Sequence, residues 1–298
     1  MEQLQFEEVV HEQEGQAITY VMQAGSDDWF CNILRKRPHA NPAWYHLHRC
    51  KLTEGRLLRY ADIGANIGTT ALLPACVGHR VLAVEAGPLN VALLTRAVQR
   101  NRLQAQVQVA HWAAAEGFGM ARFHEAGAWG STVISPTHAA LATESLVPAA
   151  ALVDILEMTG FDGVDLVKID IEGAEMAALS GFERLAQRNL ALELIVETNW
   201  ETCALHGHAP QAVWALGFSV YVLAGKRLTP VGPNLPQPRF VTDVLATRRP
   251  KEALKRLGYE LVPMDFTALP EALAQTQVGD RDPEVVRAFI DAQMARLP

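Results

Sequence analysis

The feature that most restricts the fold of this 298-residue chain is a long alternation of two kinds of segment. From Leu57 onward, short β-type runs alternate with longer runs that suit helices. This pattern is typical of parallel strands joined by helices that cover the sheet, so we predict an α/β fold. The expected strands lie at about 57–62, 80–85, 106–111, 165–170, 192–197, 218–224 and 240–247, and the expected helices at about 67–77, 88–101, 150–159, 173–187 and 208–216.

Two extensions flank the alternating region, which we place at residues 57–250. Residues 1–56 contain aromatic side chains without a clear period, and we expect them to wrap or cap the main domain, because a sheet needs both faces covered. Residues 251–298 include "PEVVRAFIDAQMARL", whose apolar positions have helical spacing. This spacing predicts a C-terminal helical extension that docks on the main domain.

Charge and cysteine content disfavour several classes of protein. The formal net charge is −7 and no basic run is longer than Arg35-Lys36-Arg37, which disfavours a nucleic-acid-binding surface. The four cysteines lie far apart, so we expect neither a zinc site nor a disulfide framework. The first residues are acidic and polar, unlike a secretion signal, and no apolar stretch reaches the roughly 18 residues of a membrane span. We therefore expect a soluble, cytoplasmic protein.

The segment "LLRYADIGANIG" reads as a buried strand ending in Asp62, a tight turn, and a helix from about Ile67. Ligands of open α/β sheets bind beyond the carboxyl ends of the strands, so this turn is the expected binding site. Gly64 and Gly68 would let a ligand approach the backbone, because a Cβ atom would occupy its space. Asn66 replaces the middle glycine of the dinucleotide fingerprint, and Asp62 would repel a diphosphate. A cationic ligand, with an ammonium or sulfonium near Asp62, fits better.

Two further strand ends suit an adenosine. Glu85 ends the next strand about 20 residues after the turn, where an acid can accept hydrogen bonds from both ribose hydroxyls. The alternative role for Glu85 is charge compensation at the helix that begins at Pro88. The following strand ends near Trp112 and Ala113, which would sandwich an adenine ring, although Trp112 suits a core position equally well.

With these residues in view, the chain resembles the FkbM-type family of S-adenosylmethionine-dependent methyltransferases over roughly residues 57–247. The resemblance lies in "DIGANIG", in "VEAGPLNVALLTRAVQRN" and above all in "VDLVKIDIEGAEMAALSGFERL" followed by "LIVETN". It implies a Rossmann-like, seven-stranded, mostly parallel sheet with a C-terminal antiparallel hairpin, of the class I methyltransferase type. It also implies that the chain binds S-adenosylmethionine and methylates an oxygen, of a hydroxyl or a carboxylate, on a small molecule, natural product or glycan.

The resemblance also implies which residues contact the cofactor. Many relatives carry proline directly after the acidic residue of the second strand, whereas Ala86 and Gly87 follow Glu85 here, and this difference would alter the ribose loop. From the methionine end to the adenine, the implied contacts are Asp62, Gly64, Asn66, Gly68, Glu85, Ala86, Trp112 and Ala113.

The strand "DLVKIDIEGAE" carries most of the residues expected to do the chemistry. Lys168 and Asp170 lie on one face of this strand, and a lysine inside a central strand needs a carboxylate partner, with Asp170 and Glu197 as candidates. Glu172 follows at the carboxyl end, while Glu175 is expected to cap the next helix. We expect Lys168, Asp170, Glu172 and Glu197 to form the catalytic group.

Methyl transfer from a sulfonium is an in-line displacement, so catalysis depends mainly on positioning. A hydroxyl acceptor must lose a proton, which Asp170 or Glu172 would take directly or through a water. Alternatively, two of the acids bind a divalent cation such as Mg²⁺, which would acidify the acceptor oxygen. A carboxylate acceptor needs no base, and Lys168 or an arginine would then steer it. No residue is assigned as a metal ligand; His46 and His48 are expected at the surface or at a helix cap.

Two other functions stay open. The first is a nicotinamide-dependent oxidoreductase, which Asn66 disfavours, and the second is a catalytically silent Rossmann-like binding protein, which the intact acidic residues disfavour. The expected partner is a small-molecule or glycan methyl acceptor, without nucleic acid or membrane, and a homodimer is left open.

Overall fold

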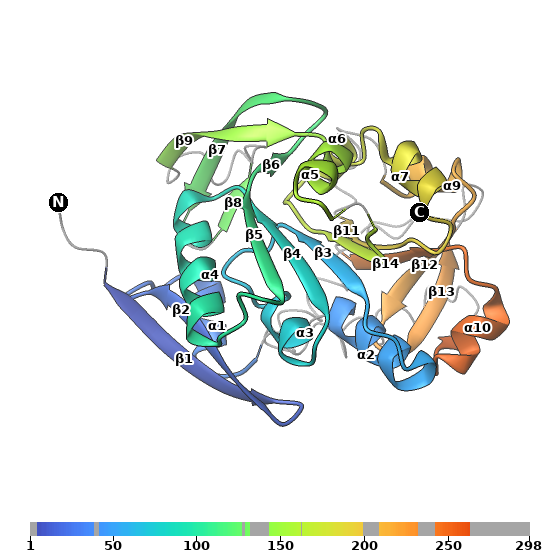
Figure 1. Ribbon diagram of the computed structural model, residues 1–298, viewed down its shortest axis with the longest axis horizontal. Coiled ribbons are helices and arrows are strands. Elements are labelled where there is room, and N and C mark those ends of the chain that lie inside the picture. The colour runs from blue at the N-terminus through green and yellow to red at the C-terminus, as the bar shows by residue number, and fades with distance from the viewer. Residues whose placement is uncertain are drawn as a thin grey trace, which may run out of the picture.

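The structure is a computed structural model that describes residues 5–38, 42–126, 129–131, 143–161, 163–198, 209–231 and 242–262. Its centre is a nine-stranded sheet with the strand order β15-β13-β12-β14-β11-β10-β3-β4-β5, which Figure 1 shows as a twisted sheet between two layers of helices. The five parallel strands are β3 (Arg59–Ile63), β4 (Arg80–Glu85), β5 (Val107–His111), β10 (Leu166–Ile169) and β11 (Glu193–Thr198).

The other edge of the sheet is mostly antiparallel. Strand β14 (Thr242–Thr247) pairs antiparallel with both β11 and β12 (Ser219–Ala224), as the predicted C-terminal hairpin requires. Two strands extend this edge, β13 (Arg227–Val231) and β15 (Glu260–Leu261). All seven expected strands are therefore present, and the predicted Rossmann-like fold is confirmed.

The predicted count of seven strands is wrong, because the sheet has nine. Strand β13 includes the first residues of the proline-rich stretch that was expected to be only a connection, and Pro230 lies opposite Tyr221 of β12. Strand β15 has two residues, too few for an alternation to be recognised in the sequence. Both additions depend on pairing with β12 and with each other, which local sequence does not encode.

Alternating residues of the central strands divide the core into two layers. Tyr60 and Leu166 face a core with α2 (Pro42–Glu54), α3 (Leu72–Cys76) and α4 (Pro88–Arg100). Ala61 and Val167 face the other core, which contains α5 (Leu152–Met158), α7 (Phe182–Arg188) and α9 (Ala209–Trp214). The expected helix at 173–187 is broken into α6 (Glu175–Ala178) and α7, because Gly181 has a left-handed φ of +71°.

A second, four-stranded sheet lies between β5 and α5 in the sequence, where no strands were predicted (Figure 1). Its order is β6 (Ala113–Ala114), β9 (Thr143–Ala150), β7 (Gly119–Ala126) and β8 (Trp129–Ser131). Its buried side chains, among them Phe123 and Val147, form a small separate core. The parallel pairing of β6 with β9 positions this sheet directly after Trp112.

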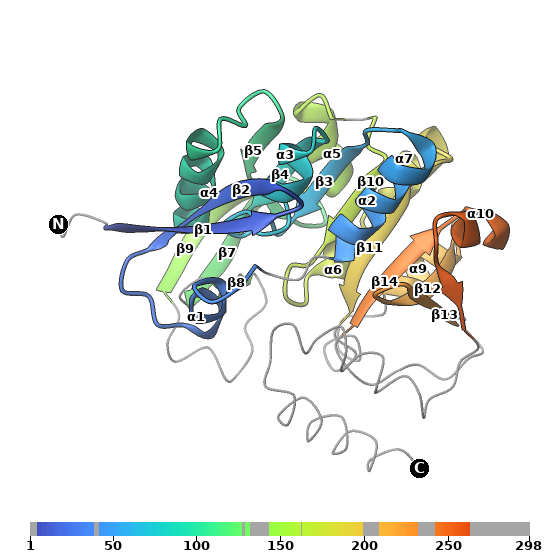
Figure 2. The ribbon, with the colours of Figure 1, turned by 90° about the horizontal axis from the view of Figure 1, so that it is seen from below.

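The described part of the N-terminal extension packs on the α3 and α4 side. Strands β1 (Phe6–Gln13) and β2 (Gln16–Gln23) form an antiparallel hairpin that lies along α4, followed by α1 (Trp29–Leu34), as Figures 1 and 2 show. The amide of Asn101, at the end of α4, makes two hydrogen bonds of 2.9 and 2.7 Å with the backbone of Thr19. The domain boundaries at 56 and 250 stay predictions.

A buried ionic network joins α2 to the amino-terminal edge of the sheet. The ring of His46 lies 3.1 Å from Oε2 of Glu193 and 2.9 Å from the hydroxyl of Tyr259, and Cys50 Sγ lies 3.7 Å from the same ring. Arg249 donates to Glu193 at 2.8 Å. The expectation that His46 lies at the surface or at a helix cap is wrong, because its exposure is 0%. Since Arg249 already supplies a cation beside Cys50 and Glu193, we interpret this cluster as structural.

The network should make stability depend on pH through His46. Burial opposes its protonation, but Tyr259 and Glu193 raise the pKa of His46 well above 6.5. Burial also raises the pKa of Glu193, but His46, Arg249 and Thr247 together lower it to about 2. The folded state then binds more protons at His46 than the unfolded state, so this stability is complete below pH 6.5 and is lost as pH rises through the folded-state pKa. We expect His46→Gln to lower the free energy of unfolding by about 1–3 kcal/mol at pH 6.

Urea denaturation from pH 6 to pH 9 measures this effect. The difference in free energy of unfolding between the wild type and His46→Gln should decrease as pH rises. A difference that stays constant would contradict the assignment of a charged His46. His48→Gln is the matched control, because His48 lies on the same helix and contacts Trp44 instead of the network.

At the C-terminal end, α10 (Lys251–Arg256) leads into β15 (Figure 2). The predicted helix within 283–297 lies outside the described residues. Among the described helices, none has the length and apolar character needed to cross a membrane. The three cysteines within the described ranges, Cys31, Cys50 and Cys76, are free thiols.

Candidate functional site

The turn after β3 is held by the carboxylate of Glu85. Its Oε2 accepts a hydrogen bond of 2.8 Å from the backbone N–H of Asn66, and its Oε1 accepts one of 2.7 Å from the N–H of Gly87. Asn66 has a φ of +51°, a left-handed conformation that asparagine tolerates better than most residues. Glu85 thus joins the ends of β3 and β4, two of the three strand ends at which the ligand was predicted.

Both glycines of this turn have a left-handed φ and lie close to other parts of the protein. Gly64 has a φ of +82°, and a Cβ atom there would lie 1.9 Å from the carbonyl oxygen of Asp170. A Cβ atom at Gly68 would lie 2.7 Å from Cδ1 of Leu94. These contacts with β10 and α4 give a second reason for the glycines, and the close approach of a ligand stays a prediction.

Asp62 and Lys168 form a buried ion pair beneath the turn. Nζ of Lys168 lies 3.5 Å from Oδ1 of Asp62 and 3.0 Å from Oδ2 of Asp170, while Thr70 Oγ1 donates to the other Asp62 oxygen. Asp62 has an exposure of 0%; burial raises its pKa, although Lys168 and Thr70 oppose the shift. The predicted contact of Lys168 with Asp170 is confirmed. The second carboxylate in contact with Lys168 is that of Asp62, and not that of Glu197, the other predicted candidate.

Four carboxyl groups gather beside this pair at the same edge of the sheet. We call Asp170, Glu172, Glu197 and Asp243 the carboxyl cluster. Carboxylate oxygens of the first three lie within 4.8 Å of one another. Asp243 is directly opposite Glu197 in the antiparallel pairing of β14 with β11. Burial and the charges of Asp170, Glu172 and Asp243 raise the pKa of Glu197 well above its usual range, and burial and Asp170 raise the pKa of Asp243 to about 7.

Asp243 is the member of this cluster that the sequence reading missed. The acidic residues at the carboxyl ends of β3, β10 and β11 follow the parallel-strand rule, which predicts that they meet. Asp243 stands near the start of β14 instead, and it reaches the same edge only because β14 runs antiparallel. The available signal was the predicted final hairpin, since an antiparallel last strand begins where the parallel strands end.

Glu175 has the capping role that was expected. Its Oε1 accepts hydrogen bonds from the backbone N–H groups of Ile171, at 3.2 Å, and Gly173, at 3.0 Å. These bonds hold the loop that carries Glu172, whose φ is +54° and whose side chain is exposed. Glu175 therefore supports the loop after β10, and it is Glu172 that faces solvent beside the cluster.

The spacing of Asp170, Glu172 and Glu197 would also suit a divalent cation. The ammonium of Lys168, however, is 3.0 Å from Oδ2 of Asp170 and would repel a metal ion there. With this cation in contact with Asp170, we assign no metal to the carboxyl cluster.

The residues expected around adenine lie beside Glu85. The backbone N–H of Trp112 donates a hydrogen bond of 3.1 Å to the backbone carbonyl of Glu85. The half-buried indole of Trp112 contacts the exposed ring of Phe118 edge to face, with 6.5 Å between the ring centroids. Ala113 is buried in β6. The carbonyl of Ala86 lies 2.9 Å from Nε2 of His111, which fixes the loop after Glu85. Phe118 was not predicted; its contact depends on the unpredicted small sheet.

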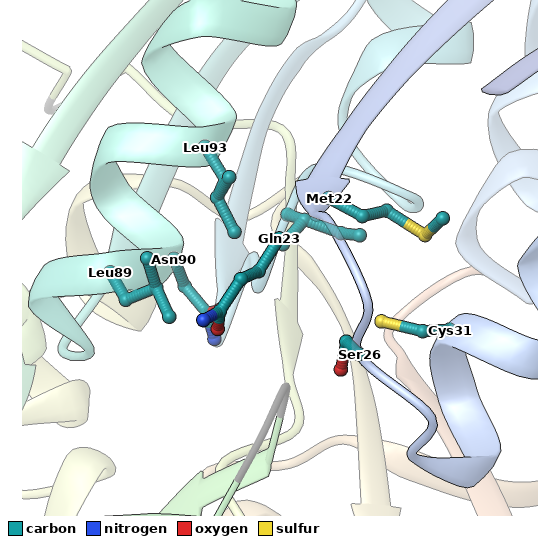
Figure 3. Close-up of a pocket in the computed structure, with 8 residues that line it drawn as sticks. Met22, Gln23, Ser26, Cys31, Leu89, Asn90 and Leu93 are labelled. Atoms are coloured by element: carbon teal, nitrogen blue, oxygen red, sulfur yellow. The ribbon is translucent and has the colours of Figure 1, made fainter. Parts of the chain in front are cut away.

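A pocket lies between the N-terminal extension and α4, as Figure 3 shows. Met22, Gln23 and Ser26 line it from the hairpin side, and Ile67 lines it from the turn. In Figure 3 the amide of Gln23 points toward Asn90 of α4. The N-terminal extension therefore borders the candidate site one residue from Asn66.

Solved structures of low sequence identity share parts of this fold. A methyltransferase FkbM from Methylobacillus flagellatus KT is 18% identical with a TM-score of 0.44, and the match covers 72% of this chain and 51% of that one. Precorrin-6y C5,15-methyltransferase from Geobacter metallireducens GS-15 is 13% identical with a TM-score of 0.40, over 70% and 87% of the two chains. The T. thermophilus 16S rRNA N2 G1207 methyltransferase, solved with AdoMet and guanosine, is 13% identical with a TM-score of 0.39, over 83% and 51%.

This chain spans about half the length of the first of these proteins. No curated protein sequence is significantly similar to it. The model of the methyltransferase FkbM domain matches residues 62–220, which run from the next-to-last residue of β3 to the second residue of β12, and the chain belongs to this family of methyltransferases.

Proposed function

We propose that this protein transfers a methyl group from S-adenosylmethionine to a hydroxyl oxygen of a small molecule, natural product or glycan. The observation that carries the proposal is the position of Glu85 within the family domain: a buried carboxylate that holds the turn after β3 at the sheet edge where ligands bind. The neighbour from T. thermophilus was solved with AdoMet, which agrees with this choice of methyl donor.

The residues present fit an adenosine with a cationic sulfur. The Glu85 carboxylate accepts backbone hydrogen bonds from Asn66 and Gly87, and a carboxylate offers about four lone-pair sites, so it can also accept hydrogen bonds from ribose hydroxyls. When bound, S-adenosylmethionine supplies an electrophilic methyl on a positively charged sulfur. The negative charge of Asp62 and the carboxyl cluster favours that charge, although Lys168 neutralises part of it. The residues that would hold the donor are Asp62, Gly64, Asn66, Gly68, Glu85, Ala86, Trp112 and Ala113.

The charge of the site favours a hydroxyl acceptor over a carboxylate. An anionic acceptor would approach the carboxyl cluster and be repelled. The alternative in which Lys168 steers a carboxylate is disfavoured, because Lys168 is buried between Asp62 and Asp170. In our proposal Lys168 positions Asp170, while Asp170, Glu172 or Glu197 takes the proton of the hydroxyl. The cytoplasmic location, the absence of a nucleic-acid partner and a homodimer stay predictions.

Glu85→Ala should weaken the binding of S-adenosylmethionine by about 1–3 kcal/mol, because ribose hydroxyls and two backbone N–H groups lose their acceptor. Isothermal titration calorimetry measures the affinity, and Glu144→Ala is the control, since Glu144 pairs with Arg122 on the exposed surface of the small sheet. Unchanged affinity in Glu85→Ala would refute the ribose assignment. Titration of the wild type with NAD separates the proposal from an oxidoreductase, which requires tight NAD binding.

A further inference from the structure

The loop after Glu85 contains one peptide group that is held at both ends. Nε2 of His111 lies 2.9 Å from the carbonyl oxygen of Ala86, and the N–H of Gly87 donates a hydrogen bond of 2.7 Å to Oε1 of Glu85. The carbonyl of Ala86 and the N–H of Gly87 belong to the same planar peptide group, in which they point in opposite directions. His111 and Glu85 therefore fix the orientation of one rigid unit from its two sides.

The ring of His111 reaches this carbonyl because of the register between two strands. The parallel strands β4 and β5 pair Glu85 with His111, and the backbone N–H of Trp112 donates to the carbonyl of Glu85. The carbonyl of Ala86 follows directly, one residue beyond the end of β4. A carbonyl oxygen only accepts hydrogen bonds, so Nε2 of His111 carries the hydrogen and donates it. The side chain of His111 thus continues the hydrogen bonding past the last backbone bond of the pair.

The residue types in the loop make this peptide group easy to reorient. Reversing a peptide plane changes ψ of the residue before it and φ of the residue after it, as in the difference between type I and type II turns. Gly87 has a φ of −69°, and a glycine also tolerates the positive φ of the reversed plane. Ala86 packs against the core of the small sheet, but this contact holds its side chain and not the plane that follows. The direction of the Gly87 N–H therefore depends on the hydrogen bonds of its own peptide group.

We propose that His111 is a positioning residue for the methyl donor: by holding the carbonyl of Ala86, it keeps the N–H of Gly87 on Glu85 and so orients this carboxylate toward the ribose hydroxyls. The inference rests on the proposed function, since the ribose is that of S-adenosylmethionine. The N–H of Asn66 holds Oε2 of Glu85, and the N–H of Gly87 holds Oε1. Without the bond from Gly87, Oε1 is held less firmly, and part of the preorganisation for the ribose is lost.

Amide hydrogen exchange of the free protein, followed by NMR, tests the contact without any ligand. His111→Phe keeps an aromatic ring but removes the donor, so the Gly87 amide should exchange about 2- to 10-fold faster than in the wild type, the scale for the loss of one hydrogen bond. The Asn66 amide is the internal control, because it bonds the other oxygen of Glu85 and lies outside the held peptide group. Its exchange should change by less than about twofold.

Calorimetry with S-adenosylhomocysteine and its 2′-deoxy analogue tests the effect on the ribose. The ratio of the two affinities measures recognition of a ribose hydroxyl, and a general loss of structure would weaken both ligands equally. His111→Phe should bind S-adenosylhomocysteine about 2- to 10-fold more weakly, with a smaller ratio than the wild type. His111→Gln carries an amide donor and should restore both values. His124→Phe is the matched control, since His124 is also a partly buried strand histidine, in β7, and it should bind as the wild type does.

Unchanged exchange of the Gly87 amide in His111→Phe would overturn the inference. An unchanged affinity ratio in this variant would overturn it as well, and so would equal losses in His111→Gln and His111→Phe. If His111→Phe fails to fold, nitrogen-15 NMR of the wild-type His111 ring decides, because a hydrogen on Nδ1 alone excludes donation to Ala86. Failure of the wild type to bind S-adenosylmethionine would instead overturn the proposed function, and the exchange experiment in the free protein distinguishes the two failures.

Discussion

Gly64→Ala is expected to lower the free energy of unfolding by about 2–5 kcal/mol, measured by urea denaturation. Two effects add. A left-handed conformation costs a residue with a Cβ atom about 1–2 kcal/mol, and forced overpacking costs about 1–3 kcal/mol. The added carbon would lie 1.9 Å from the carbonyl oxygen of Asp170, and this atom belongs to the backbone, so no rotamer change removes the clash.

Gly217→Ala is the matched control for this prediction. Gly217 has a φ of +80°, almost the same as the +82° of Gly64, but nothing lies within 4 Å of its added Cβ atom. Gly217→Ala should therefore lower the free energy of unfolding only by the cost of the left-handed conformation, about 1–2 kcal/mol. If the two variants lose equal stability, the close approach of the turn to Asp170 is not what requires glycine at position 64. Gly64→Ala should also bind S-adenosylmethionine more weakly, because the added Cβ atom would push the turn away from β10 and so move Asn66.

Lys168→Met should destabilise the fold by about 3–5 kcal/mol at pH 7, the usual loss when one partner of a buried ion pair is removed. Asp62 is completely buried and would lose the cation 3.5 Å from its Oδ1. The pKa of Asp62, already raised by burial, would then rise further. A folded state that binds more protons than the unfolded state gains stability as pH falls. The loss in free energy of unfolding of Lys168→Met relative to the wild type should therefore become smaller at lower pH.

Denaturation of Lys168→Met at pH 5 and pH 8 measures this trend. Lys226→Met is the control: its ammonium lies 2.6 Å from Glu260, but the side chains are 60% and 49% exposed, and the expected loss is below about 1 kcal/mol. The double variant Lys168→Met with Asp62→Asn should recover part of the stability, since it removes the stranded charge. A loss in Lys168→Met as small as that in Lys226→Met would contradict a buried pair.

The parts of the site that were predictable share one physical basis. Each of the four acidic residues Asp62, Glu85, Asp170 and Glu197 lies within one residue of the carboxyl end of a parallel strand. Parallel strands bring these ends to one edge of the sheet whatever the details of packing. The capping role of Glu175 was equally local, because an acid in the first turn of a helix can reach nearby N–H groups. These features follow from the order of residues along the chain.

The parts that were missed depend on pairs of segments far apart in the sequence. His46 was expected at the surface, yet it is buried against Glu193 and Tyr259, which lie on other elements. Lys168 contacts Asp62 of a neighbouring strand, and no spacing within either strand specifies that register. The small sheet and strand β13 likewise exist only through pairing between strands.

By itself the sequence determined the α/β fold, the seven core strands and the edge at which the ligand residues gather, because alternation and strand-end residues are local signals. Only the tertiary structure decided why Gly64 must be glycine, which carboxylates share Lys168, and that Asp243 faces Glu197. These contacts depend on how the strands pair and on the direction of the last strand. The order of residues along a single strand specifies neither the pairing nor the direction.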